Sequence, residues 1–184
     1  MELQENISPS KAALNSGLII GLVMVTLTFI IYFINYTFLV AAWYGFAVFA
    51  LFFGMVIYFG IQYRKDIGGF MTFGTAFQFA FVTLIVSGLI TTFGNILLYQ
   101  VINPELSEIL VKVQLENMMD LLDNFGASDS LSSEQIKDMR VDDMEDAFTI
   151  GGQVSSFGIS LFIYAILSLI LGAIIKKRDK STDF

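Results

Sequence analysis

Residues 12–63 read AALNSGLIIGLVMVTLTFIIYFINYTFLVAAWYGFAVFALFFGMVIYFGIQY and contain no Asp, Glu, Lys, Arg or His. This charge-free run is about 52 residues long, whereas one transmembrane helix needs about 20 apolar residues. The clearly polar cluster within the run is Asn35-Tyr36-Thr37, which marks a turn. The run therefore predicts two membrane-spanning helices, over about residues 14–34 and 40–61.

Two further apolar stretches follow. The first predicts a helix over about residues 73–101 that ends at Asn103-Pro104, because proline cannot continue the helical hydrogen-bond ladder. The second predicts a helix over about residues 150–175, and the basic run Lys176-Lys177-Arg178 that follows is typical of a stop-transfer anchor. We therefore expect an all-α, four-span transmembrane helical bundle. A soluble four-helix bundle is the alternative, but it would need polar faces that the first two helices lack.

Composition excludes most familiar active sites. Of the 184 residues 55% are hydrophobic and 15% charged, against roughly 25% charged in soluble domains. There is no Cys and no His, so thiolate chemistry, disulfides and the commonest general base and metal ligand are missing. We expect no catalytic, cofactor-binding or metal-binding residues, no enzymatic activity and no nucleic-acid partner.

Residues 102–149 predict a small acidic helical insertion between the third and fourth spans. Residues 105–147 hold 12 carboxylates and three cations, yet apolar residues recur with helical spacing. This spacing predicts an amphipathic helix over about residues 105–124, and Ser132 with Gln135 resembles the capping box of a second helix. We expect the apolar residues Leu110, Val113, Leu121 and Leu122 to face the membrane surface or each other.

The densest carboxylates in this insertion are Asp142, Asp143, Glu145 and Asp146. They lack the alternating acids around a glycine that a calcium loop requires. A solvated acidic helix face is the favoured interpretation, and cation binding is left open.

Basic residues indicate the orientation. Lys11, the Arg64-Lys65 pair and the cationic tail fall in three segments that lie on one side of a four-span protein. The positive-inside rule therefore predicts that both termini are cytoplasmic and that the acidic insertion lies outside. The first ten residues carry no features of a cleavable signal peptide.

Two sets of intramembrane residues are candidates for specific contacts. Gly17 and Gly21 form a small-xxx-small motif that allows close helix packing, and Ala50/Gly54 and Ser168/Gly172 are looser versions of it.

A candidate polar face on the third span comprises Gln78, Ser87, Thr91, Thr92 and Asn95. These side chains either form interhelical hydrogen bonds or line a polar pathway. We favour the first interpretation, because pumps usually place an ionisable residue within the membrane and these spans have none.

Short motifs near the ends of the last two spans carry a family resemblance. Gly69-Phe70-Met71-Thr72-Phe73-Gly74 leads to Ala76-Phe77, and the sequence continues with Ile102-Asn103-Pro104 and ends its last span with Lys176-Lys177. In these motifs the chain resembles the bacterial integral membrane family called domain of unknown function 4199. The resemblance implies a small inner-membrane protein and transfers no catalytic or binding residues.

Two functional hypotheses follow. The first is a membrane-embedded interaction or accessory subunit, surrounded by the lipid bilayer, that contacts a protein partner through the acidic insertion. The second is a small transporter or channel component that uses the polar face of the third span. A water-accessible polar cavity would favour the second. The sequence leaves the oligomeric state open.

Overall fold

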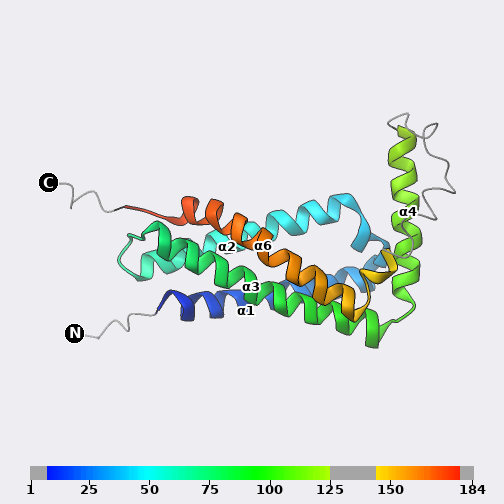
Figure 1. Cartoon of the computed structure of the whole chain (residues 1–184), viewed down its shortest axis with the longest axis horizontal. Helices are drawn as coiled ribbons and strands as arrows, with labels where there is room; N and C mark the ends of the chain where they lie inside the picture. Colours follow the sequence, from blue (N-terminus) through cyan, green and yellow to red (C-terminus); the bar gives the residue numbers. More distant parts are fainter. Residues whose placement is uncertain (1–7, 125–143, 179–184) are drawn as a thin grey trace. The chain divides into compact units, whose positions relative to one another are not determined.

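The computed structural model describes residues 8–124 and 144–178. It contains four helices long and apolar enough to cross a membrane, and the predicted four-span, all-α fold is confirmed. These helices are α1 (Pro9–Asn35), α2 (Ala42–Asp66), α3 (Phe73–Leu97) and α6 (Ile150–Ile175) (Figure 1). The chain is therefore a multi-pass membrane protein.

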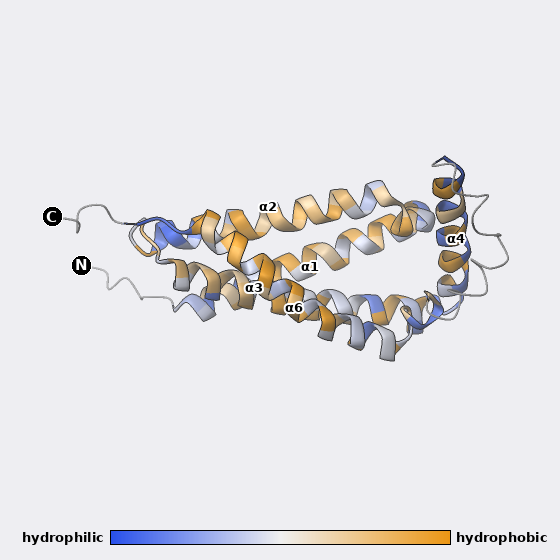
Figure 2. Cartoon of the chain, turned by 45° about the horizontal axis from the view of Figure 1, so that its top comes forward, coloured by the Kyte–Doolittle hydropathy of each residue, from blue (hydrophilic) through white to orange (hydrophobic). Residues whose placement is uncertain are grey.

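Most residues of the long helices are hydrophobic, as the largely orange ribbons of Figure 2 show. Phe46 of α2, Phe93 of α3 and Phe162 of α6 are 76%, 71% and 78% exposed. Water would penalise so many uncovered aromatic and aliphatic side chains, whereas lipid does not. The excess of apolar residues therefore serves contact with lipid more than it serves a protein core.

Polar side chains define where the long helices begin. Ser8 Oγ accepts a hydrogen bond from the Lys11 backbone N–H at 3.3 Å, directly before Pro9. Thr72 Oγ1 accepts from Thr75 N–H at 3.3 Å at the start of α3, and Thr149 Oγ1 accepts from Gly152 N–H at 3.0 Å at the start of α6. Each of these side chains satisfies a first-turn donor that has no partner within the helix.

The bounds of two helices differ from the predicted ones. α1 begins at Pro9 rather than near residue 14, and α2 continues to Asp66 rather than ending near residue 61. Proline is favoured in the first turn of a helix. Arg64 and Lys65 extend α2 because cations are favourable near a helix C-terminus.

The described chain forms two compact units. Among the described residues, unit 1 comprises residues 8–24, 49–91 and 157–178, and unit 2 comprises residues 25–48, 92–124 and 144–156. Within unit 1 the rings of Tyr63 and Phe79 stack at 5.3 Å between centroids. The fully buried side chains of its core include Ile20, Val56, Phe79, Leu84, Leu171 and Ile175.

Unit 2 contains the connections. Asn35 ends α1, and its Oδ1 accepts hydrogen bonds from the N–H and Oγ1 of Thr37, which starts the 3-10 helix η1 (Tyr36–Val40). The predicted polar turn thus lies at this break. At the other connection the π-helix η2 (Leu98–Ile102) leads through Asn103-Pro104 into α4 (Leu106–Asn124).

Helix α4 runs across the direction of the last turns of α3 rather than continuing it (Figure 1). Leu106 and Leu110 in its first half form a buried core together with Leu98 and Tyr99 of η2. Leu39 and Val40 of η1 pack against this core. Of the residues expected to face the membrane surface or each other, Leu110 is buried and Val113 and Leu122 are half-buried. Leu121 is 53% exposed, so of the two predicted environments only the membrane surface remains for it. The second predicted helix, from Ser132, lies outside the described residues.

Candidate functional site

The polar series of α3 makes two hydrogen bonds to α1. Gln78 Nε2 donates to Ser10 Oγ at 3.0 Å, and Thr83 Oγ1 donates to the Ala13 carbonyl oxygen at 3.4 Å. Thr83 is completely buried. Both bonds lie within unit 1, and each is of the kind that contributes about 0.6 kcal/mol inside a membrane.

Ser87 and Thr91 donate hydrogen bonds to carbonyl oxygens of α3 rather than to another helix, as was expected. Ser87 Oγ donates to the carbonyl oxygens of Thr83 and Leu84 at 2.8 and 3.1 Å, and Thr91 Oγ1 donates to the Ser87 carbonyl at 2.9 Å. These hydroxyls are therefore satisfied by their own helix, a common solution for Ser and Thr. The interhelical interpretation is wrong for these two residues.

Glycines in unit 1 allow the helices to approach closely. A Cβ atom at Gly21 would come within 2.7 Å of the Ile90 Cβ, and one at Gly172 within 3.1 Å of the Phe77 backbone nitrogen. At Gly54 a Cβ would meet nothing within 4 Å, so the Ala50/Gly54 motif provides no such contact. Thus α1 and α6 both pack tightly on α3.

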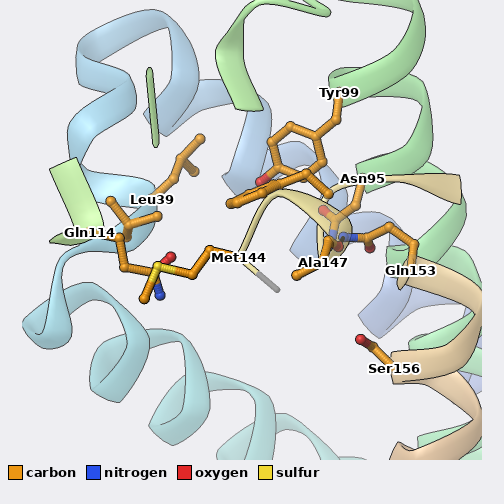
Figure 3. A pocket seen from close by; sticks show the side chains of 10 residues that line it. Leu39, Asn95, Tyr99, Gln114, Met144, Ala147, Gln153 and Ser156 are labelled. Carbon is orange, nitrogen blue, oxygen red and sulfur yellow. Dashed lines mark hydrogen bonds between the residues drawn. The ribbon is translucent and has the colours of Figure 1, made fainter. Parts of the chain in front are cut away.

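Unit 2 contains a cavity of about 560 Å³ (Figure 3). Side chains from η1, the end of α3, η2, α4 and α6 contribute to it. Its lining residues are Leu39, Val40, Asn95, Tyr99, Gln114, Met144, Ala147, Phe148, Gln153 and Ser156. Asn95 is thus the member of the predicted polar face that borders this cavity. Gln78, Ser87 and Thr91 belong to unit 1 and are not part of its lining.

Aromatic and amide groups hold the cavity wall in place. The Tyr99 and Phe148 rings meet edge to face at 5.0 Å between centroids, and Gln100 Nε2 donates to the Phe148 carbonyl at 2.9 Å. Gln153 Nε2 donates to the Ala147 carbonyl at 2.8 Å. The backbone that leads into α6 is therefore fixed to the end of the third span.

Asn95 differs from these residues. It is half-buried, and no hydrogen bond joins its amide to any other described residue. Thr92, also half-buried, lies one turn earlier in the same unit. A partner for Asn95 on another helix was expected from the sequence, and none occurs among the described residues. Its amide instead offers a donor and an acceptor to the cavity.

The chemistry of the cavity is neutral. Asn95, Gln114 and Gln153 supply amides and Ser156 a hydroxyl, and none of the lining residues that the structure describes is charged. The described part of the wall suits water or an uncharged polar group. The carboxylates Asp142 and Asp143, considered for cation binding, lie outside the described residues.

The sequence matches the family described as "Protein of unknown function (DUF4199)" over residues 15–177. The chain belongs to this family. No curated protein and no solved structure matches it. The matched residues of this DUF4199 protein include most of α1 and all of α2, α3, α4 and α6, so both compact units belong to the family fold.

Sequence reasoning missed one feature of this DUF4199 protein. The backbone of Met71, before α3, pairs with that of Lys177, after α6, through two hydrogen bonds of 2.9 and 3.0 Å. Gly68 and Gly69 precede this pair with φ angles of 98° and 87°. Glycine adopts such angles without strain, so the adjacent glycines were the available signal that the loop bends sharply. Nothing in the sequence indicated its pairing partner.

Proposed function

We propose that this DUF4199 protein is a membrane-embedded interaction or accessory subunit and not an enzyme. The observation that carries the proposal is that the polar residues of α3 up to Thr91 are hydrogen-bonded within the protein. Gln78 and Thr83 bond to α1, while Ser87 and Thr91 bond to carbonyls of α3 itself. Thr83 and Ser87 are fully buried. Gln78 and Thr83 thus hold α1 against α3, and the hydroxyls bonded within α3 are not available to line a hydrated path along its middle.

The charge distribution supports the same role. No charged residue occurs between Lys11 and Arg64, between Asp66 and Glu105, or between Asp146 and Lys176. Proton-coupled carriers and voltage sensors need ionisable groups within the membrane. A subunit that only provides a contact surface for another protein does not need ionisable groups within the membrane.

The proposed contact surface is the second half of α4. Glu116, Asp120 and Asp123 are exposed there, and Leu121 is exposed beside them. An exposed apolar side chain on an acidic helix matches a partner that offers a small apolar pocket and basic groups. We place this surface outside the cytoplasm and both termini inside it, in a bacterial inner membrane, because the cations gather at the other loops.

Site-specific photo-crosslinking in intact membranes tests this role. A photoreactive residue at Leu121 should give one discrete adduct of higher mass, while the same residue at Phe162, which is exposed on α6, should give lipid adducts only. Tagged and untagged copies of the chain distinguish a second copy from another protein. The absence of any protein adduct at Leu121 would refute the proposed contact surface.

The cavity beside Asn95 favours a second candidate, a small transporter or channel component. Its amide-lined wall could receive an uncharged polar solute. Uptake of labelled neutral solutes into proteoliposomes separates the two roles. A flux that disappears in Asn95→Leu while the protein remains folded would establish the transporter role and displace the accessory role.

A further inference from the structure

A short backbone pairing joins two loops at one end of unit 1. Met71 N–H donates to the Lys177 carbonyl at 2.9 Å, and Lys177 N–H donates to the Met71 carbonyl at 3.0 Å. Met71 is only 3% exposed. The segment that follows α6 is therefore held against the loop between α2 and α3. We call residues 64–73 and 175–178 the basic clip.

Arg64 makes the second connection within the basic clip. Its Nη1 donates to the Ile175 carbonyl oxygen at 2.6 Å. The last carbonyls of a helix have no partner within it and carry partial negative charge, so Arg64 is directed at the end of α6. The remaining cations Lys65, Lys176, Lys177 and Arg178 are left exposed.

Two of the exposed cations lie over aromatic rings. Lys176 Nζ is 5.7 Å from the Phe73 ring centroid, and Lys177 Nζ is 5.6 Å from that of Phe70. Phe70 and Phe73 are 43% and 40% exposed. Each of these two ammonium groups is thus paired with a partly exposed ring in a cation–π contact.

The basic clip has a strong excess of positive charge. The clip contains one carboxylate, Asp66, and five cations, which are Arg64, Lys65, Lys176, Lys177 and Arg178. Asp66 accepts a hydrogen bond from Gln62 Nε2 at 3.5 Å. Four exposed cations held by a fixed backbone form a site for an anion at the end of the membrane-spanning helices.

We propose that the basic clip binds the phosphate group of an anionic phospholipid. Clusters of Lys and Arg next to transmembrane helices attract anionic headgroups. A free phosphate ion would satisfy the cations alone. A lipid would also cover the exposed rings of Phe70 and Phe73 with its glycerol and upper acyl region, because aromatic rings favour that depth of the bilayer. This ligand goes beyond the proposed accessory role and does not depend on it.

Lipid titration of the purified full-length protein tests the proposal. In nanodiscs of dioleoyl phosphatidylcholine, an increasing fraction of dioleoyl phosphatidylglycerol should raise the melting temperature, and native mass spectrometry should retain the anionic lipid. The double substitution Lys176→Gln and Lys177→Gln should weaken this response by about tenfold. The backbone pairing does not require these side chains, so the variant should fold. Lys176→Arg with Lys177→Arg should preserve the response.

Three outcomes would overturn the proposal. An equal response to the zwitterionic lipid would show that charge is not recognised. An equal response to inorganic phosphate in detergent would show that the clip takes a free anion. Lys112→Gln removes an exposed cation of α4, and an equal loss in that control would show a general charge effect.

Discussion

Gly17 of α1 lies so close to Val86 of α3 that a Cβ atom at position 17 would come within 2.8 Å of the Val86 Cβ. The same atom would be 2.9 Å from the Thr83 carbonyl oxygen. Neither neighbour is the flexible end of a side chain, so neither can move aside easily. This approach lets Thr83 reach the Ala13 carbonyl of the facing helix.

Gly17→Ala should therefore destabilise the protein by about 1–3 kcal/mol, the usual effect of overpacking. Gly54→Ala is the matched control, because a Cβ there meets nothing within 4 Å, and it should leave stability unchanged or raise it slightly. Reversible unfolding in mixed micelles measures both. Equal stabilities of the two variants would contradict a tight contact between α1 and α3.

Removal of the Arg64 side chain should loosen the end of α6. Its guanidinium bonds to the Ile175 carbonyl oxygen, and hydrogen bonds to charged groups contribute about 1.5–3 kcal/mol when partly protected. Arg64→Ala should therefore increase amide hydrogen exchange across the last turn of α6, as measured by mass spectrometry. Arg178→Ala, which removes an exposed cation nearby, should not. Equal protection in both variants would argue against this cap.

The two halves of α4 should respond differently to truncation. Leu110 is completely buried in the core of unit 2, whereas Leu121 is 53% exposed. Leu110→Ala should cost about 2–5 kcal/mol of unfolding free energy, because it leaves a cavity. Leu121→Ala should cost about 0.5 kcal/mol or less. Denaturant titration of the two variants compares them directly, and a large loss in Leu121→Ala would mean that another part of the chain covers it.

The spans were predictable because their physical signal is long and redundant. Dozens of consecutive uncharged residues leave few alternatives, and Asn35-Tyr36-Thr37 interrupts the first run where α1 ends. Helix ends were harder to predict. Ser8-Pro9 is a recognisable start signal for α1, but hydropathy alone points to the first apolar residues, several positions later.

The roles of the polar residues could not be read from the sequence. Periodicity places Ser87 and Thr91 on one face of α3, but it does not say whether a hydroxyl bonds to a neighbouring helix or to its own helix. Both bond to their own. The pairing of Met71 with Lys177 joins residues more than a hundred positions apart, and an isolated backbone pair leaves no alternating pattern in either segment.

Topology gives a prediction that is independent of packing. Reporter fusions after Phe184 and near Gln4 should both read cytoplasmic, and an insertion near Ser128 should read external, because the cations flank the other loops. Paired alkaline phosphatase and fluorescent reporters measure the three sites. A cytoplasmic signal at Ser128 would be incompatible with the proposed orientation.

The last prediction concerns Asn95 at the cavity of unit 2. Its amide forms no hydrogen bond with another described residue, so Asn95→Leu removes no hydrogen bond within the described chain and introduces a side chain of similar size. The unfolding free energy should change by about 1 kcal/mol or less. Thr83→Val is the control on the same helix. It deletes the fully buried hydrogen bond to the Ala13 carbonyl and should destabilise by about 0.6 kcal/mol.

Stability alone does not distinguish a water-filled cavity from a ligand site, so Asn95→Leu should also be assayed for solute uptake in proteoliposomes. If the protein is an accessory subunit, the wild type and the variant should show the same background flux, because Gln78, Ser87 and Thr91 of α3 are already hydrogen-bonded within unit 1. If the cavity receives a solute, loss of the Asn95 donor and acceptor should abolish a flux that Thr83→Val leaves intact. That pair of results would assign the Asn95 amide to solute binding and reject a purely structural role for this end of α3.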